Sequence, residues 1–210
     1  MLIRFFKPFG VLCQFRSSDG RATLADYIPQ RGVHAAGRLD FDSEGLLLLT
    51  DDGPLQSRIT EPRHKLPKTY LAQVEARPAP AELEDLALRL QAGIALRDGL
   101  ARALAMHAAA PVGVLRRAPE VTPHRAARSS WVEVVLTEGR NRQVRRMLAA
   151  VGLPVLRLLR TAIGPIGLQG LAPGEWEIVE PPDAWRDPRE SRHKSNVAAV
   201  RRRGPRDPTS

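Results

Sequence analysis

Residues 37–53, GRLDFDSEGLLLLTDDG, hold five carboxylates within a short stretch of chain. Such a group can bind a cation, exchange protons or attack an electrophilic carbon. The spacing of Asp40, Asp42 and Glu44 matches the first ligands of a calcium loop, which requires a bidentate glutamate at its twelfth position. Here that position is Asp51, and four leucines stand where further ligands are needed. The stretch therefore favours a catalytic carboxylate over a calcium site.

Asp40 differs from its acidic neighbours because it follows a base, Arg38, and an apolar residue, Leu39. An aspartate in this setting can cap a turn, pair with an arginine or act as a nucleophile. Asp42 and Glu44 are interpreted as solvated loop charges ahead of a buried strand. Asp40 is thus the first candidate for chemistry.

A second candidate group is the arginine-rich stretch 138–147, EGRNRQVRRM. The helical spacing i, i+3, i+4 and i+7 predicts one apolar stripe, formed by Val144, Met147, Leu148 and Val151. Arg142 and Arg146 fall on the opposite face. Arg145 lies at the border, where its stem can be buried while its guanidinium pairs with a partly buried carboxylate.

The arginines of this stretch have Glu138 as their single acidic neighbour in the sequence. An ordinary amphipathic helix with a solvated basic face would produce a similar pattern. However, like charges at this density repel one another unless an anion is bound. A phosphate-binding ridge with Arg145 turned inward therefore explains the pattern better.

Tyr70 follows Lys68 at the start of the predicted strand KTYLAQVE. A tyrosine in a strand is usually a half-buried core residue with its hydroxyl at the surface. Next to a basic residue it can instead stack on a nucleotide base, a contact that contributes about 1–3 kcal/mol. Both interpretations remain open from the residues alone.

The elements that position these residues follow from periodicity and turn signals. Helices are expected at 21–29, from Asp52 and Pro54 onward, at 78–94 and at 142–154, and residues 96–128 suggest a strand pair with a mobile loop. The run LLLLT is expected to be a strand buried on both faces. Without a regular βαβ alternation, the pattern predicts an α+β fold with a mixed, largely antiparallel sheet. The expected strands are two short ones within 2–15, then 46–50, 68–75, 131–139, 155–163 and 175–179.

Composition limits the function classes. The chain has 210 residues, a net charge of +9 and a single cysteine, Cys13, so an internal disulfide and a cysteine-based zinc site are excluded. No apolar run approaches the length of a membrane helix, and a cytoplasmic monomer is expected. Residues 186–210 carry eight basic and three acidic residues, a net +5. Residues 1–185 are therefore expected to form the catalytic domain, followed by a disordered basic tail.

Taken together, the motifs HAAGRLDFDSEGLLLLTDDG, KTYLAQV, EGRNRQVRRML and RTAIGPIGLQGLAPGEW resemble those of the pseudouridine synthases, in the branch that modifies ribosomal RNA. The resemblance extends to residue 180. It implies two subdomains flanking an RNA-binding cleft, and a catalytic domain without the S4-like RNA-binding domain of many relatives. Its most similar type acts on large-subunit (23S) ribosomal RNA.

The resemblance also implies roles for individual residues. Asp40 would be the catalytic carboxylate, Tyr70 would stack on the target base, and Arg145 would pair with Asp40. Arg38 would enter the RNA near the vacated base position. The remaining residues expected to contact RNA are Lys68, Arg140, Asn141, Arg142, Gln143 and Arg146. Two small departures are Ser43, where the family commonly has threonine, and Asp51, where it commonly has asparagine.

The implied reaction breaks the N-glycosidic bond of a uridine, rotates the base and joins its C5 to C1′. A nearby carboxylate can stabilise or trap the electron-deficient sugar, and a paired arginine would keep that carboxylate ionised. Because no redox step or external energy source is needed, neither a cofactor nor a metal is expected. The base must be flipped out of structured RNA.

Two alternatives remain. A non-catalytic RNA-binding or ribosome-assembly factor could retain this fold, and in that case Asp40→Asn would leave modification untouched. A glycosidase needs two spaced carboxylates and a sugar cleft, whereas the acids here cluster in one loop.

Overall fold

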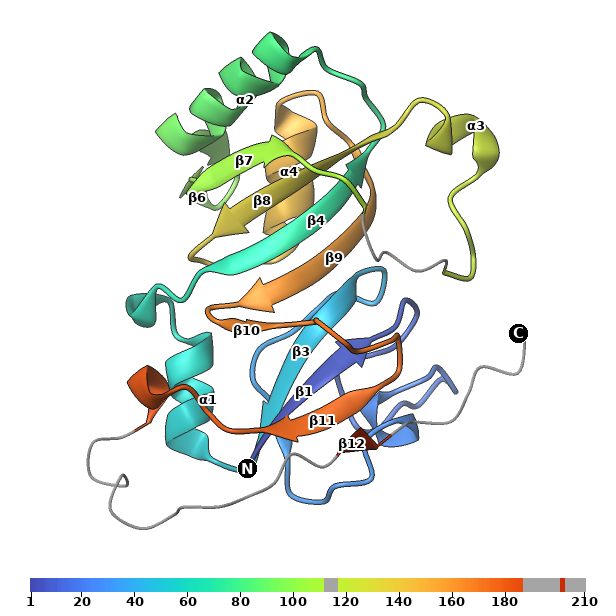
Figure 1. Cartoon of the computed structure of the whole chain (residues 1–210), viewed down its shortest axis with the longest axis vertical. Helices are drawn as coiled ribbons and strands as arrows, with labels where there is room; N and C mark the ends of the chain where they lie inside the picture. Colours follow the sequence, from blue (N-terminus) through green and yellow to red (C-terminus); the bar gives the residue numbers. More distant parts are fainter. Residues whose placement is uncertain (112–116, 187–200, 203–210) are drawn as a thin grey trace. The chain divides into compact units, whose positions relative to one another are not determined.

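The computed structural model describes residues 1–111, 117–186 and 201–202. The chain divides into two compact units, one formed by residues 1–64 and 165–210 and the other by residues 65–164. Figure 1 shows both units, each built on β-strands with helices beside them. The predicted α+β class with a largely antiparallel sheet is confirmed.

The sheet of the first unit has the strand order β12-β11-β1-β3, with the short strand β2 also paired to β3. The neighbouring strands in this order are antiparallel. The central strand β1 (Leu2–Lys7) pairs Ile3 with Leu49 and Lys7 with Gly45 of β3. The other elements of the unit are η1 (Leu24–Asp26), β2 (His34–Ala35), β3 (Glu44–Thr50), α1 (Gly53–Thr60), η2 (Pro62–His64), β10 (Ile166–Gly167), β11 (Trp176–Val179), η3 (Asp183–Trp185) and β12 (Arg201–Arg202).

Strand β3 is buried along its whole length, as the four consecutive leucines predicted. Leu47 and Leu49 pack with Ile3, Phe5 and Trp176 in one hydrophobic cluster. Helix α1 contacts β3 and begins as expected, because the Asp52 carboxylate accepts a hydrogen bond from the backbone N–H of Leu55 (2.9 Å). The acidic loop that precedes β3 is thus attached to a fully buried strand.

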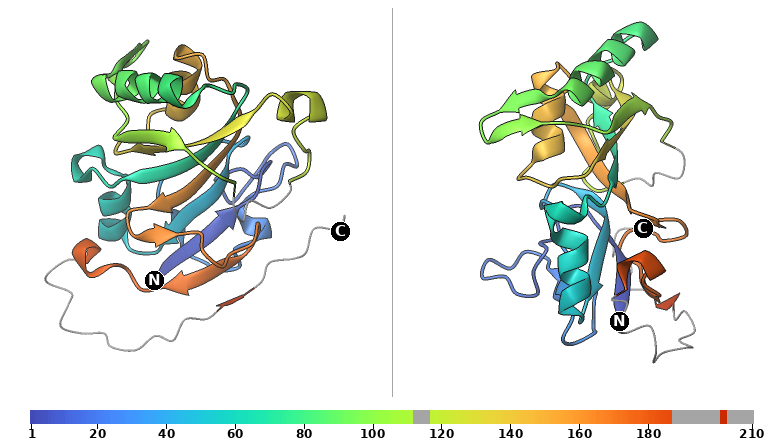
Figure 2. Two further views of the ribbon diagram at one scale, coloured as in Figure 1. Left: turned by 45° about the horizontal axis from the view of Figure 1, so that its top comes forward. Right: turned by 90° about the vertical axis from the view of Figure 1, so that its left-hand side faces the viewer.

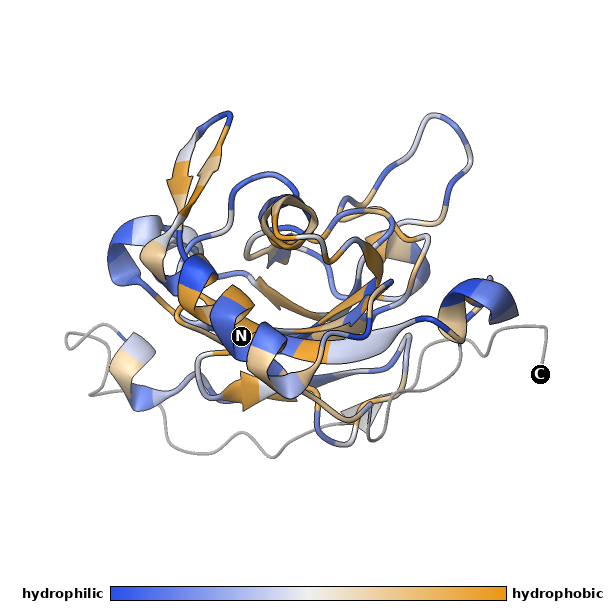
Figure 3. Ribbon diagram, turned by 90° about the horizontal axis from the view of Figure 1, so that it is seen from above, coloured by the Kyte–Doolittle hydropathy of each residue, from blue (hydrophilic) through white to orange (hydrophobic). Residues whose placement is uncertain are grey.

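The sheet of the second unit has the order β9-β4-β8-β7, again antiparallel between neighbours. Hydrophobic residues concentrate in its strands (Figure 3). Each residue of β4 pairs with a residue of β8, for example Tyr70 with Val134 and Ala72 with Val132. The elements are β4 (Lys68–Val74), α2 (Pro80–Ala92), β5 (Ile94–Leu96), β6 (Gly99–Ala101), β7 (Ala105–Ala108), α3 (Pro123–Ala126), β8 (Ser130–Leu136), α4 (Gln143–Ala150) and β9 (Val155–Ile163).

Helices α2 and α4 contribute to the same hydrophobic core as this sheet. Leu83, Leu86 and Leu90 form the buried stripe of α2, which ends at Gly93 with a positive φ of 119°. The stripe predicted for α4, including Met147 and Leu148, is buried against the strands, and Figure 2 shows this helix beside the sheet. The sequence periodicity therefore identified the correct inner faces.

Several element predictions need revision. The N-terminal segment forms one strand, since Leu12 makes only an isolated bridge to Thr23. The helix expected at 21–29 is the single turn η1. Residues 96–128 contain parts of three strands and α3, and residues 112–116 of the expected mobile loop lie outside the described residues. In the predicted tail, Arg186 and β12 are described and the other residues are not. Across the described part of the chain, none of the helices has the length and apolar character needed to cross a membrane.

Candidate functional site

Asp40 lies in a tight turn whose backbone is fixed by several hydrogen bonds. The N–H of Ser43 donates to the carbonyl oxygen of Asp40 (3.0 Å), and the N–H of Gly10 donates to the carbonyl oxygen of Phe41 (2.9 Å). The N–H of Leu39 donates to the Sγ atom of Cys13 (3.2 Å). Asp40 itself is half-buried, while Leu39 on one side is buried and Phe41 on the other is exposed. The turn therefore presents a carboxylate in a defined position with part of its side chain accessible.

Arg38 is exposed two residues before Asp40. Gly37, which precedes it, has a positive φ of 92°, a conformation that glycine adopts without strain. The predicted Arg38 and Asp40 therefore lie on the same short loop, as their separation in the sequence requires.

Lys7 is a buried cation next to this acidic loop and was not among the residues predicted from the sequence. Its side chain is 0% exposed, and its ammonium group donates to the carbonyl oxygens of Pro8 and Val11, each at 2.8 Å. Burial lowers the pKa of Lys7 to about 8, although nearby acidic groups including Glu44 and Asp40 act in the opposite direction. A lysine that directly follows two phenylalanines in a mostly apolar strand was the available signal.

Glu44 corrects the expectation that it is a solvated loop charge. It is the first residue of β3 and only 2% of it is exposed. The pairing of Lys7 with Gly45 places the Lys7 strand next to Glu44, and the charges of Glu44 and Asp42 both act on the Lys7 ammonium. The negative charge of the acidic loop is thus partly compensated by the Lys7 ammonium, which belongs to the same unit. Among the described residues, no three His, Cys, Asp or Glu side chains are grouped so that they could hold a metal ion.

Tyr70 belongs to the core of the second unit. It is 7% exposed and packs in the cluster that includes Val134 and Met147. In the ladder with β9 it pairs with Arg160, and the register shifts between Thr69 and Tyr70. Such a bulge changes the direction of a side chain and is common next to active sites.

Lys68 and Arg160 place two positive charges near Tyr70. Arg160 is buried in β9 and was not predicted from the sequence, although an arginine within the apolar run VLRLLRTAI is unusual. Burial lowers the pKa of Lys68, and the charge of Arg160 acts in the same direction.

The loop before α4 is held together by Gln143 and Glu138. The side-chain oxygen of Gln143 accepts a hydrogen bond from the N–H of Arg140 (2.9 Å), and its amide nitrogen donates to Glu138 (2.6 Å). Arg140 also pairs with Glu138 (2.9 Å). Gln143 is buried and shapes this loop, and its contact with RNA stays a prediction.

The exposed side chains of this loop are those of Asn141 and Arg142, and Gly139 is exposed beside them. Arg142 is the N-cap residue of α4 and has a positive φ of 48°, which is uncommon for a residue other than glycine. Backbone strain of this kind is frequently found at ligand-binding loops. Both residues stay candidates for contact with RNA.

Arg145 lies on α4 with a partly buried side chain, as the helical wheel predicted. Its Nη1 atom donates to the carbonyl oxygen of Val155 at the start of β9 (3.1 Å). Arg146 differs, because its guanidinium forms a two-point pair with Asp98 (2.8 and 2.9 Å). The assumption that Glu138 is the single acid near these arginines is therefore wrong: Asp98, in the β5–β6 turn, is also present.

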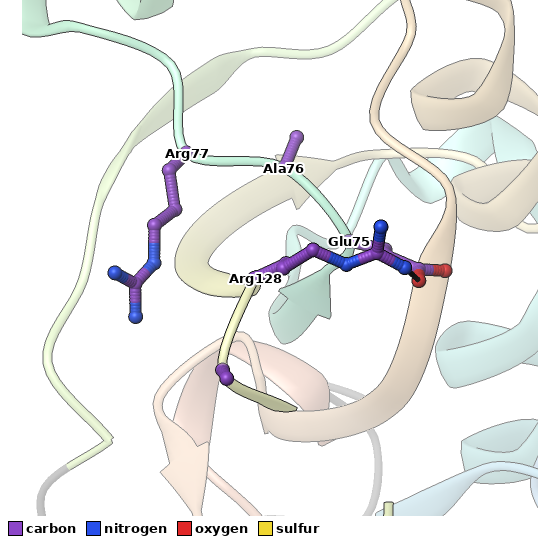
Figure 4. Close-up of a pocket in the computed structure, with 5 residues that line it drawn as sticks. Glu75, Ala76, Arg77 and Arg128 are labelled. Atoms are coloured by element: carbon purple, nitrogen blue, oxygen red, sulfur yellow. Dashed lines mark hydrogen bonds and ion pairs between the residues drawn. The ribbon is translucent and has the colours of Figure 1, made fainter. Parts of the chain in front are cut away.

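A cavity of about 640 Å³ lies elsewhere in the second unit, and Figure 4 shows the residues that line it. Glu75, Arg77 and Arg128 are the charged members, and Glu75 forms ion pairs with Arg128 (3.1 Å) and Arg125 (2.7 Å). Glu75 follows the end of β4, about 16 Å along the strand from Tyr70 at the usual rise per residue. None of the predicted site residues lines this cavity.

Comparison with known proteins places these observations in a family. A sequence model for the family described as RNA pseudouridylate synthase matches residues 2–150. The ribosomal large subunit pseudouridine synthase E of Xanthomonas campestris pv. campestris is 50% identical over 189 residues, which covers 85% of this chain and 95% of the relative. The protein of the same name from Vibrio vulnificus is 46% identical over 181 residues, covering 86% of this chain and 76% of the relative.

A solved structure agrees with this assignment. The crystal structure of a pseudouridylate synthase is 31% identical in sequence, with a TM-score of 0.63, and the match covers 83% of this chain and 68% of that chain. The sequence motifs, the fold and the relatives lead to one conclusion: this chain belongs to the RNA pseudouridylate synthase family.

Proposed function

We propose that the chain isomerises a specific uridine of large-subunit (23S) ribosomal RNA to pseudouridine, as a monomer in the cytoplasm. The ribosomal substrate is supported by the two relatives, named ribosomal large subunit pseudouridine synthase E, which match along most of their length. The observation that carries the catalytic proposal is the half-buried Asp40 in a turn fixed by backbone hydrogen bonds. A carboxylate held in this way can act on a substrate without reorganising.

In this proposal Asp40 stabilises or traps the electron-deficient C1′ atom as the bond to N1 of the uracil breaks. The base then rotates, C5 bonds to C1′, the proton on C5 is lost to solvent and N1 takes up a proton. Tyr70 stacks on the base and assists removal of the C5 proton. Arg145 pairs with Asp40 and maintains its charge and orientation.

RNA binding is assigned to the remaining basic residues. Arg38 would occupy the space left by the flipped base, since it lies on the same loop as Asp40. Lys68 is assigned to a phosphate because it is a basic residue two positions before Tyr70 at the start of β4. Asn141 and Arg142 supply the exposed side chains of the α4 loop, and the partly buried Arg140 and Arg146 add positive charge next to them.

The deciding experiment maps pseudouridine in ribosomal RNA from cells that lack this protein and from cells complemented with wild type or Asp40→Asn. We expect one site to disappear, to return with wild type and to stay absent with the variant. If the variant restores the site, the chain acts as a non-catalytic RNA-binding or assembly factor. If no site changes in the deletion strain, the proposed substrate is wrong.

A further inference from the structure

Phe41 is an exposed aromatic side chain directly after the proposed catalytic residue. It is 37% exposed, which makes it the most exposed of the phenylalanine, tyrosine and tryptophan side chains that the structure describes. The preceding apolar residue, Leu39, is 7% exposed, so the turn buries one apolar side chain and presents the other to solvent. Exposing a phenyl ring has a free-energy cost that a binding function can offset.

The position of the Phe41 ring is defined by its neighbours. Its backbone carbonyl accepts the hydrogen bond from Gly10, and its ring lies 6.5 Å from that of Phe9, measured between centroids, at an interplanar angle of 47°. Gly10 is close enough that a Cβ atom there would be 3.8 Å from the ring. The ring is therefore supported from one side by the turn at residues 8–10.

A cation completes the arrangement. The guanidinium of Arg21 lies over the Phe41 ring, with its Cζ atom 5.2 Å from the centroid. Asp19 holds this guanidinium, with Nε–Oδ2 and Nη2–Oδ2 distances of 2.7 and 2.6 Å. Arg21 remains about half exposed in spite of this pair. Two phenyl rings and a guanidinium thus meet on the surface of the first unit.

This combination has the chemistry of a stacking site for a nucleotide. Unpaired bases stack on phenyl rings and on guanidinium planes, and an arginine beside the ring can also contact a phosphate. We propose that Phe41, with Phe9 and Arg21, binds an unpaired base of the RNA that neighbours the uridine acted on at Asp40. The site would thus contribute to RNA recognition. The proposal rests on the proposed function in one respect, namely that the nucleotide bound at Asp40 is the uridine to be isomerised.

The short distance between Asp40 and Phe41 along the backbone indicates that Phe41 would bind the nucleotide next to the uridine. The Cα atoms of consecutive residues are about 3.8 Å apart, and side chains of a few ångströms extend from each. A base on Phe41 must therefore lie close to the nucleotide at Asp40. Flipping a base also unstacks its neighbours, and a protein ring that restacks one of them compensates for part of that cost.

The test compares three substitutions of Phe41 that separate stacking from packing. Phe41→Ala removes the ring, Phe41→Leu keeps apolar bulk without a π-face, and Phe41→Tyr keeps the ring. We expect the dissociation constant for a fluorescein-labelled, single-stranded oligouridylate to rise about tenfold with alanine and leucine. With tyrosine it should stay within about twofold of wild type.

Leu88→Ala is the control, because it removes an exposed apolar side chain from α2, outside the proposed site. Thermal unfolding of each variant checks that the turn is intact. Wild-type affinity in Phe41→Leu, with an unchanged melting temperature, would overturn the stacking proposal. The binding measurement does not depend on catalysis, whereas absence of pseudouridine formation by the wild type would contradict the proposed function instead.

Discussion

Arg146 of α4 and Asp98 of the β5–β6 turn form a two-point ion pair, with Nη1–Oδ1 and Nη2–Oδ2 distances of 2.8 and 2.9 Å. The hydrogen bond from Arg146 is the main cause that lowers the pKa of Asp98, and the charge of Arg140 acts in the same direction. One carboxylate thus reduces the positive charge of two arginines assigned to RNA binding. Asp98 therefore weakens the attraction of this surface for phosphates.

Asp98→Asn is expected to strengthen RNA binding. Removing the negative charge leaves Arg146 and Arg140 more available to phosphates, so affinity should rise about threefold or more at low salt. The plot of log affinity against log salt should steepen by about one. Because the pair is exposed, the melting temperature should change little. The control is Asp85→Asn, which makes the same charge change on the exposed face of α2. Equal effects of the two substitutions would mean that only net charge matters.

Arg145→Met is expected to lower the single-turnover rate of pseudouridine formation by about 100-fold or more, because under the proposed function this substitution removes the partner that orients the Asp40 carboxylate. Arg145→Lys should recover only part of the rate, since an ammonium cannot form the paired hydrogen bonds of a guanidinium. If Arg145 acts through Asp40, then the variant with both Arg145→Met and Asp40→Asn should be no slower than Asp40→Asn alone. Arg89→Met, on the exposed side of α2, provides the control.

Lys7→Met is expected to change how stability depends on pH. The pKa of Lys7 is about 8 in the folded chain, below the value of 10.5 for a free lysine. Between these pH values the unfolded chain binds more protons than the folded one, so this lysine makes wild-type stability rise with pH. The difference in unfolding free energy, wild type minus variant, should therefore increase by up to about 3 kcal/mol from pH 8 to pH 10.5.

Urea unfolding at a series of pH values measures this difference. Lys65→Met removes an exposed lysine and serves as the control. A wild-type minus Lys7→Met difference that stays constant above pH 8 would show that Lys7 is accessible to water, in conflict with its burial.

Removal of residues 187–210 is expected to weaken RNA binding without changing the chemical step. This segment has seven basic and three acidic residues, a net charge of +4. The truncation keeps Arg186, which forms an ion pair with Glu180. Affinity and its salt dependence should both fall, because fewer counterions are released from the RNA. The rate at saturating RNA should stay the same. A variant in which glutamine replaces the seven basic residues keeps the length, and it should behave like the truncation. Loss of the rate at saturation would refute this role.

The sequence alone identified the features that depend on local patterns. Four consecutive leucines predicted the buried strand β3, and the spacing of Val144, Met147 and Leu148 predicted the inner face of α4. Asp52 was recognisable as a helix cap because capping involves a backbone group three residues away. Asp40 was singled out by its immediate neighbours and by the motif around it, and no structural contact was needed for that step.

Only the tertiary structure brought together residues that are distant in the chain. The β1–β3 register places Lys7 next to Glu44. Glu44 is therefore a buried residue beside a cation and not a solvated loop charge. The β5–β6 turn brings Asp98 to Arg146, and the turn at residues 8–10 supports the ring of Phe41. These contacts depend on strand register and on loop conformation, which no short sequence pattern encodes. A residue type and its spacing can therefore indicate a candidate, but the charges and surfaces that surround it are set by the fold.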